Sequence, residues 1–186
     1  MIQMDESRFR LLYSAEQVTE ASKRIGEEVT PWAKKVYEET GKDIIGIPIL
    51  RGGLFFFADV VRNVRHSVEL APVRTWAYEV GVNAVERAEL QIQTDGLQPK
   101  GRSLLLFDDV CDSGRTLLEL TEKLKASGAA EVRSAVLLKR KQKKDIFDPD
   151  WIGFEYSGDE WFVGCGMDDK DRFRNSPAVH TIIKGS

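Results

Sequence analysis

Apolar residues recur at helical spacing near the start of the chain, between residues 14 and 38. Ser14, followed by Glu16 and Gln17, is typical of a helix start. The apolar positions that fall on one helical face are Val18, Ile25, Val29, Trp32 and Val36. The pattern predicts a long amphipathic helix that packs on a core through this face.

A short apolar run follows at residues 43–50 and ends in Arg51-Gly52-Gly53. A second helical pattern covers residues 54–64, with aromatic residues at its start. A strand, a glycine turn and a helix in this order are typical of the opening of a parallel α/β unit.

A second unit of the same kind spans residues 103–138. Its strand is the apolar run 104–107, and the helix after it ends near Gly128. The helical face carries Leu117, Leu120 and Leu124. Residues 133–138 form the next apolar run, so we expect a β-α-β unit. The two units together predict the α/β class, with a mainly parallel sheet flanked by helices.

The other segments give weaker patterns. Residues 73–78 and 89–93 read as strands, and the polar stretch between them is either a hairpin or a mobile loop. The last third consists of short strands and loops, with apolar runs at 151–156 and 161–164. Since there is no internal repeat or linker, we expect residues 1–186 to form a single domain.

Composition narrows the class of protein. The chain has 42% hydrophobic and 31% charged residues, as a folded protein does, and its formal charge of −3 argues against nonspecific nucleic-acid binding. No apolar run is long enough for a signal peptide or a membrane span. Only Cys111 and Cys165 are present, too few for a disulfide framework. We therefore expect a cytoplasmic protein with no membrane and no nucleic-acid partner.

The most informative stretch for chemistry is residues 104–117, which read LLLFDDVCDSGRTL. Asp108 and Asp109 follow a buried strand, at the sheet edge where ligands of α/β proteins bind. Their carboxylates suit Mg²⁺ or sugar hydroxyls. Residues 112–116 would present backbone N–H groups, two hydroxyls and a helix N-terminus to a phosphate, and Gly114 would let the backbone approach it closely.

Each part of this string has an ordinary structural interpretation. Two aspartates after a strand commonly form a turn, and Asp112 alone reads as a helix N-cap. In one continuous string, however, the residues closely resemble the signature of type I phosphoribosyltransferases that binds phosphoribosyl pyrophosphate (PRPP).

Further segments are similar to the hypoxanthine-guanine phosphoribosyltransferase family within that class. Residues 49–59 look like its pyrophosphate loop and the helix that follows. Residues 149–174 resemble its purine-binding C-terminal region, and Lys139-Arg140, after the expected strand 133–138, fits its base-recognising lysine. The resemblance extends over nearly the whole chain and implies the type I phosphoribosyltransferase fold with a small hood.

For PRPP, the resemblance implies one group of contacts. Asp108 and Asp109 would hold the ribose hydroxyls and Mg²⁺, and the Leu50–Arg51 peptide is a candidate for the cis form. The residues implied to bind PRPP are Arg51, Gly52, Gly53, Asp108, Asp109, Asp112, Ser113, Gly114, Arg115, Thr116 and Arg174.

For the base, the resemblance implies a second group. Lys139 would donate to the 6-oxo group, Trp161 would stack on the purine, and Phe162 would offer backbone hydrogen bonds. Asp168 would lie near a metal ion and the purine edge, although Asp169 competes for this assignment. Outside the resemblance, Lys139 reads as a solvated charge and Trp161 as core packing.

The implied catalytic residues are Asp112, as the base for the purine N7 proton, and Lys139. The hood would be built from the N-terminal and C-terminal segments, and residues 74–95 would form a mobile lid. Tyr78 is the candidate lid residue. The implied metal ligands are Asp108, Asp109 and Asp168.

The sequence departs from the family at three places. Asp108-Asp109 stands where many members have Glu-Asp, which keeps the charge but shortens the reach. Ala77-Tyr78 stands where the lid usually carries Ser-Tyr. Cys165-Gly166-Met167 replaces a segment that more often contains an aromatic residue, which bears on base preference.

The expected function is therefore transfer of a phosphoribosyl group from PRPP to a 6-oxopurine with Mg²⁺, by a homodimer or homotetramer. Three alternatives stay open at this point. One is a xanthine-preferring enzyme, because specificity depends on a few hydrogen bonds. The second is a PRPP-sensing regulatory protein that binds RNA, and the third is a structural protein with a degenerate site.

Overall fold

The computed structural model describes residues 4–71, 73–78, 89–93, 97–141 and 146–183, with only the backbone described at 73–78 and 89–93. The helices are α1 (Ala15–Thr40), α2 (Leu54–Val61) and α3 (Arg115–Ala126). The strands are β1 (Phe9–Tyr13), β2 (Ile44–Leu50), β3 (Val68–Leu70), β4 (Val73–Tyr78), β5 (Glu89–Gln93), β6 (Ser103–Cys111), β7 (Glu131–Arg140), β8 (Trp151–Tyr156), β9 (Phe162–Val163) and β10 (Val179–Ile182).

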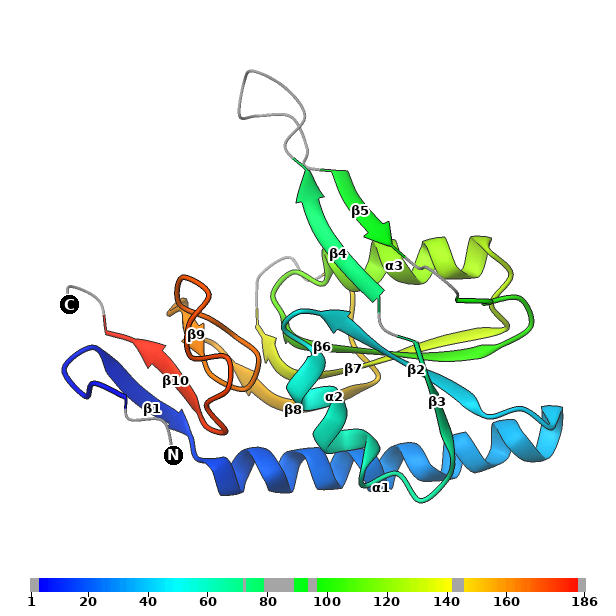
Figure 1. Cartoon of the computed structure of the whole chain (residues 1–186), viewed down its shortest axis with the longest axis horizontal. Helices are drawn as coiled ribbons and strands as arrows, with labels where there is room; N and C mark the ends of the chain where they lie inside the picture. The colour runs from blue at the N-terminus through cyan, green and yellow to red at the C-terminus, as the bar shows by residue number, and fades with distance from the viewer. Residues whose placement is uncertain (1–3, 72, 79–88, 94–96, 142–145, 184–186) are drawn as a thin grey trace.

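The main sheet has the strand order β5-β4-β2-β6-β7-β8, and β3 pairs with the start of β2. Neighbours run parallel throughout, except that β5 is antiparallel to β4 (Figure 1). The predicted α/β class with a mainly parallel sheet is confirmed.

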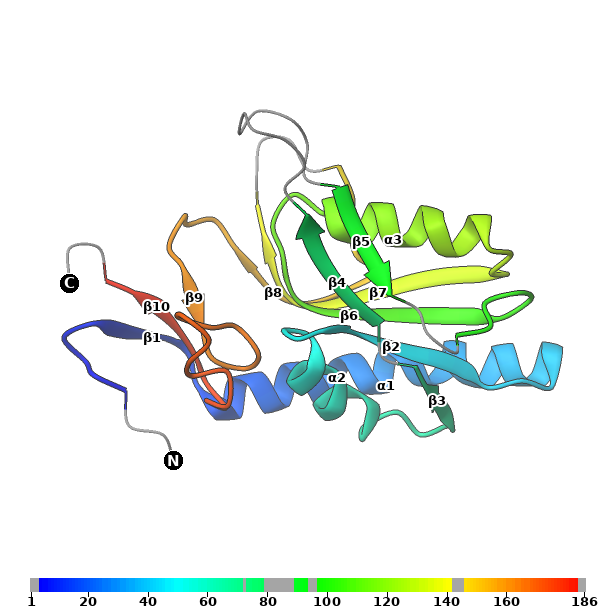
Figure 2. The same ribbon diagram turned by 45° about the horizontal axis from the view of Figure 1, so that its top comes forward.

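Helices cover both faces of this sheet. In Figure 2, α3 lies on one side, and α1 and α2 lie on the other. Each layer has its own core: Phe56 and Phe57 of α2 pack with Phe107, while Leu117 and Leu120 of α3 pack in a second cluster. The sheet is therefore buried on both faces, which is why its strands are continuous apolar runs.

The start of α1 agrees with the prediction from sequence. The Gln17 backbone N–H donates to Ser14 Oγ at 3.3 Å, and the Ser14 backbone N–H donates to Gln17 Oε1 at 2.9 Å. This reciprocal capping box fixes the first turn. The predicted face is also confirmed, because the buried residues of α1 include Val18, Ile25, Val29, Trp32 and Val36.

A second, smaller sheet has the order β1-β10-β9 and is antiparallel. It joins the N-terminal strand to the C-terminal strand at one end of the molecule (Figure 1). The sequence patterns did not predict β1, β10 or the short strand β3.

The end of β7 also differs from the sequence expectation. β7 runs to Arg140 rather than ending at 138, so Lys139 and Arg140 lie within the strand. β4 and β5 form the expected strand pair. Residues 79–88 and 94–95 of the expected lid 74–95, and the side chain of Tyr78, lie outside the described residues. Among the helices described, none is long and apolar enough to span a membrane.

Candidate active site

The candidate site lies where β2, β6 and β7 reach the same edge of the parallel sheet. Because these strands are parallel neighbours, the residues at their carboxyl ends converge. Arg51-Gly52-Gly53 follows β2, Asp108 and Asp109 lie near the end of β6, and Arg140 ends β7. The topology thus brings together segments that are far apart in the sequence.

The two aspartates are held by local hydrogen bonds. The Asp109 N–H donates to Asp108 Oδ1 at 3.0 Å, and the Val110 N–H donates to Asp109 Oδ1 at 2.9 Å. Burial raises the pKa of both carboxyls, and the neighbouring Asp109 charge raises the pKa of Asp108 further. A bound cation would stabilise the charged form of these two carboxylates.

The backbone of the pyrophosphate-loop candidate packs tightly against these carboxylates. The Leu50–Arg51 peptide bond is cis. A Cβ on Gly52 would lie 2.1 Å from Asp109 Oδ2, and a Cβ on Gly166 would lie 1.9 Å from the Gly52 carbonyl oxygen. Since only glycine fits at either position, three segments of the chain meet at van der Waals distance here.

The loop between β6 and α3 encloses a cavity of about 240 Å³. Gly114 has a φ of +84° and is the N-cap of α3, so the interpretation of Asp112 as the N-cap is wrong. A Cβ on Gly114 would lie 2.6 Å from Phe147 Cβ, which leaves no room for a side chain. The residues that line the cavity are Asp108, Val110, Cys111, Asp112, Ser113, Gly114, Arg115, Thr116 and Leu117.

Two arginines face each other across a single carboxylate beside this loop. Arg51 Nη2 lies 2.6 Å from Asp171 Oδ1, and Arg174 Nη2 lies 3.2 Å from the same oxygen. The Arg174 hydrogen bond and the Arg51 charge lower the pKa of Asp171. Arg174 also donates to the Gly166 carbonyl at 2.6 Å. The structure thus gathers both predicted arginines at one place, while Asp171 was missed from sequence.

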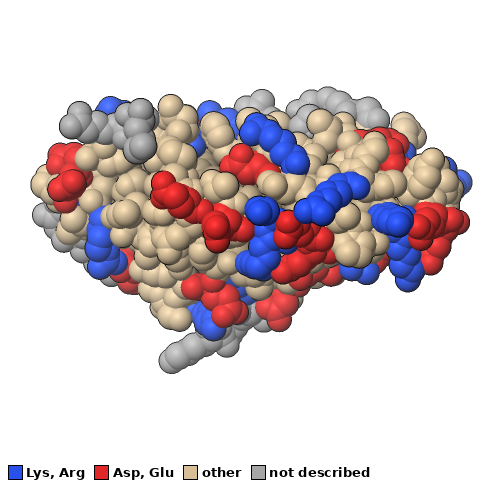
Figure 3. Space-filling model, turned by 90° about the horizontal axis from the view of Figure 1, so that it is seen from below, with Lys and Arg blue, Asp and Glu red and all other residues tan. Residues whose placement is uncertain are grey.

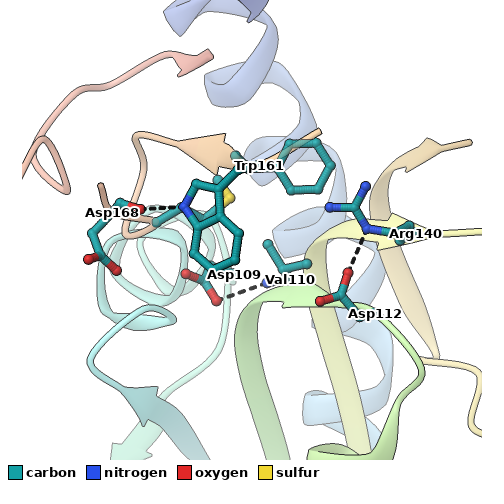
Figure 4. A pocket seen from close by; sticks show the side chains of 8 residues that line it. Asp109, Val110, Asp112, Arg140, Trp161 and Asp168 are labelled. Carbon is teal, nitrogen blue, oxygen red and sulfur yellow. Dashed lines mark hydrogen bonds and ion pairs between the residues drawn. The ribbon is translucent and has the colours of Figure 1, made fainter. Parts of the chain in front are cut away.

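An aromatic pocket of about 190 Å³ opens beside Asp109 (Figure 4). Trp161 is 64% exposed and forms one wall, so it does not serve as core packing. Its indole Nε1 donates to the Asp168 carbonyl at 2.7 Å, which fixes the ring orientation. The lining residues are Asp109, Val110, Asp112, Arg140, Trp161, Phe162, Met167 and Asp168.

Phe162 lines this pocket from the edge strand β9. The Ile182 N–H donates to the Trp161 carbonyl at 3.0 Å, and the next pair in the ladder is Phe162 with Thr181. Because hydrogen-bonded and non-hydrogen-bonded pairs alternate in antiparallel strands, the N–H and C=O of Phe162 point away from β10. They are available to a planar ligand with donors and acceptors on its edge.

Asp168 and Asp169 lie in different surroundings. Asp168 lines the pocket, and its Oδ1 lies 2.6 Å from Arg174 Nη2. Asp169 is buried and forms an ion pair with Arg8 of the N-terminal segment. Within the residues described, no three carboxylate, histidine or cysteine side chains cluster closely enough to hold a metal ion. Asp108, Asp109 and Asp168 therefore do not form one cage.

Lys139 is not among the residues that line the aromatic pocket. Its side chain is 3% exposed, and Nζ donates to the Phe147 carbonyl at 3.1 Å, with Asp148 Oδ1 at 3.7 Å. Arg140, its neighbour in β7, lies in the pocket instead, where its Nε donates to Asp112 Oδ1 at 2.6 Å. No role for Arg140 was predicted from the sequence.

The sequence pattern of the phosphoribosyl transferase domain family matches residues 15–170, and the chain belongs to this family. The hypoxanthine-guanine phosphoribosyltransferase of Lactococcus lactis is 32% identical over 180 residues, which cover 96% of this chain and 93% of that protein. The hypoxanthine phosphoribosyltransferase of Haemophilus influenzae is 29% identical over 182 residues, 97% of this chain and 98% of that protein.

Solved structures show the same fold. A hypoxanthine phosphoribosyltransferase from Staphylococcus aureus superposes with a TM-score of 0.80 at 23% identity, covering 94% of this chain and 91% of that one. The hypoxanthine phosphoribosyl transferase of Trypanosoma cruzi gives a TM-score of 0.82 at 18% identity, covering 98% and 95%.

Proposed function

We propose that the protein transfers the 5-phosphoribosyl group of PRPP to N9 of hypoxanthine or guanine, releasing pyrophosphate and forming IMP or GMP. The observation that carries this proposal is the meeting of two sites at one sheet edge. A phosphate-sized cavity at the start of α3 lies next to an aromatic pocket, and Val110 and Asp112 border both. Relatives about 30% identical over most of the chain are named for this activity.

PRPP would bind along the edge formed by the two loops. Residues 112–116 would receive the 5-phosphate through backbone N–H groups and the α3 N-terminus. Gly52 and Gly53 would hold the pyrophosphate with the guanidinium groups of Arg51 and Arg174, which already share one carboxylate oxygen of Asp171. An anionic pyrophosphate would replace that carboxylate as their partner.

The purine would enter the aromatic pocket. Trp161 would stack on the ring, and the outward-facing backbone groups of Phe162 would bond to its edge. Lys139 does not line this pocket, so base recognition by Lys139 requires its side chain to move away from its position beside the Phe147 carbonyl.

In the reaction, the N9 lone pair attacks the anomeric carbon of the ribose while the bond from that carbon to pyrophosphate breaks. The proton on purine N7 passes to the carboxylate of Asp112, which lines both cavities. Arg51 and Arg174 stabilise the charge that develops on the pyrophosphate. Asp112→Asn is expected to lower the single-turnover rate about 100-fold, with the dissociation constant of PRPP little changed.

Magnesium fits the residues present. Asp108 and Asp109 offer adjacent hard oxygen donors whose negative charge is costly to bury. Mg²⁺ commonly binds one or two carboxylates together with substrate phosphates rather than a complete protein cage, as the described residues require. A bound ion would neutralise charge on the pyrophosphate, and Asp168 would lie near a second ion.

We also propose a lid, a single domain, a cellular location and an assembly for this protein. Residues 74–95 would close over the site as a lid, with Tyr78 at its base, and residues 1–186 would act as one domain. Cys111 and Cys165 are buried and are not joined by a disulfide, which suits a reducing cytoplasm. A homodimer or homotetramer is the proposed assembly, and α2 exposes Leu54 and Phe55 as apolar contact surface.

The test is PRPP-dependent and Mg²⁺-dependent nucleotide formation, with hypoxanthine, guanine, xanthine and adenine assayed separately. Turnover of hypoxanthine or guanine, slowed by Asp112→Asn, supports the proposal. Turnover of xanthine alone would replace it with the xanthine-preferring alternative. No turnover of any base would contradict the enzyme and leave the RNA-binding regulator.

The surface disfavours the RNA-binding alternative. On the face drawn in Figure 3, basic and acidic side chains are interspersed rather than separated into a basic patch. Neighbouring charges also neutralise each other in pairs along α1, such as Lys34 with Glu38 and Lys35 with Glu39. A surface of this kind offers little net attraction to a phosphate backbone.

A further inference from the structure

We infer that Arg140 is a positioning residue for the reaction: its guanidinium holds the Asp112 carboxylate and ties it to the loop that carries Trp161. The inference rests on the proposed function, because Asp112 matters here as the base that receives the purine N7 proton. Arg140 and Asp112 lie side by side in the wall of the aromatic pocket (Figure 4).

The first observation is the hydrogen bonding of Arg140. Its Nε donates to Asp112 Oδ1 at 2.6 Å, Nη2 donates to the Glu160 carbonyl at 3.0 Å, and Nη1 donates to the Gly158 carbonyl. All three nitrogens of the guanidinium are therefore engaged, each with a different residue. Such a planar group with several partners has a defined orientation.

The second observation is the aromatic packing of the same guanidinium. Its central carbon lies 4.3 Å from the ring centroid of Phe162 and 6.0 Å from that of Tyr156. The Tyr156 hydroxyl in turn donates to Glu160 Oε2 at 2.8 Å. These cation–π contacts restrict the guanidinium plane further.

The third observation is the difference in exposure within the pair. The side chain of Arg140 is 14% exposed, whereas that of Asp112 is 60% exposed. Asp112 does not cap α3, because the N-cap is Gly114. The well-packed arginine thus restrains an otherwise exposed carboxylate.

The consequence concerns the geometry of proton transfer. Arg140 donates to Oδ1 of Asp112, and Oδ2 of the same carboxylate would receive the proton from purine N7. Since Arg140 also holds the carbonyls of Gly158 and Glu160, it fixes the distance between Asp112 and the segment that ends in Trp161. Base and purine are then aligned before reaction, which is where positioning lowers a barrier.

The experiment compares Arg140→Met and Arg140→Lys with the wild type. We expect Arg140→Met to lower the single-turnover rate of nucleotide formation about 10-fold or more, as loss of alignment does. The dissociation constant of Mg²⁺·PRPP should change less than about threefold, since residues 112–116 would bind PRPP through backbone N–H groups, whereas Arg140 bonds the side chain of Asp112. Arg140→Lys keeps the positive charge but loses the planar set of guanidinium donors. Its single-turnover rate should therefore lie between those of the wild type and Arg140→Met.

The decisive comparison repeats Arg140→Met in the D112N background. If Arg140 acts through Asp112, Arg140→Met should lower the single-turnover rate of the D112N variant less than about twofold, because the two residues act as a unit. Equal loss in both backgrounds would overturn the inference, and so would a wild-type rate for Arg140→Met. Should Arg140→Met fail to fold, the same cycle with Arg140→Lys gives the answer.

Arg102→Met is the matched control. Arg102 is 15% exposed and likewise anchors a backbone carbonyl, that of Asp43 at 2.9 Å, but it lies before β6 at the opposite end of the strand from the site. Its replacement should leave the single-turnover rate unchanged. A wild type inactive with every base would contradict the proposed function itself, whereas an active wild type with an equally active Arg140→Met contradicts only this inference.

Discussion

At the scale of single residues, the site depends on glycines that let separate segments touch. The Gly166 backbone lies against the Gly52 carbonyl, and the Gly52 backbone lies against the Asp109 carboxylate. Each contact is closer than any side chain permits. The geometry of residues 51–53 is therefore set from the C-terminal segment as well as from β2.

Gly166→Ala should disrupt this geometry. Gly166 has a φ of +101°, and its added Cβ would lie 1.9 Å from the Gly52 oxygen, so the loop must move. We expect kcat/KM for PRPP to fall by about 10-fold or more, since displacements near 1 Å have effects of this size. Steady-state kinetics with PRPP as the varied substrate would measure this fall in kcat/KM.

Gly41→Ala is the control for backbone strain. Gly41 has a φ of +68° at the end of α1, and its Cβ would meet nothing within 4 Å. The variant should lose about 1 kcal/mol of unfolding free energy and keep its kcat/KM. Equal kcat/KM for Gly166→Ala and the wild type would show that the close contact between Gly166 and the Gly52 carbonyl does not affect the reaction.

His180 gives a pH dependence. Burial lowers its pKa below the ordinary value of 6.5. The stability that the neutral ring provides is complete above the unfolded pKa and is lost as pH falls through the folded pKa. Between pH 7.5 and 5.5, urea unfolding should show a larger loss of free energy for the wild type than for His180→Asn. Equal losses would contradict this role.

Some residue assignments could be predicted from sequence and others could not. Asp108 and Asp109 were visible because they stand in one continuous string, between an apolar run and residues 112–116. Arg140 was not, because its partners are main-chain carbonyls 18 and 20 residues away and a loop aspartate 28 residues away. Neighbouring residues in a strand point to opposite faces, and sequence does not say which of Lys139 and Arg140 faces the pocket.

At the scale of elements, local signals were sufficient where an element is stabilised locally. The start of α1 is fixed by Ser14 and Gln17 within a single turn. The strands β1 and β10 are different, because they pair with each other across almost the whole chain. Five-residue and four-residue segments carry too little pattern for prediction when their partner is unknown.

Ser14→Ala tests whether the cap of α1 is purely structural. The substitution removes the side-chain acceptor of the Gln17 N–H. We expect a loss of about 1 kcal/mol in the free energy of unfolding, measured by urea denaturation, and unchanged kcat/KM. A fall in kcat/KM would instead link the N-terminal segment directly to the site.

At the scale of the whole molecule, one core connects the main sheet to the smaller sheet. The cluster that contains Val29 of α1 and Phe107 of β6 also contains Phe162 and Val179 of the smaller sheet. The Arg8–Asp169 ion pair joins the N-terminal segment to the loop after Trp161. The aromatic pocket is thus positioned by both ends of the chain, which local sequence patterns cannot reveal.

The most direct test of the account is a competition between bases. Hypoxanthine, guanine, xanthine and adenine at equal concentration would be incubated with the protein, Mg²⁺ and limiting PRPP, and the nucleotide products quantified by mass spectrometry. The account predicts that IMP or GMP dominates and that AMP is absent. Dominant AMP, or PRPP that remains intact with every base present, would contradict it.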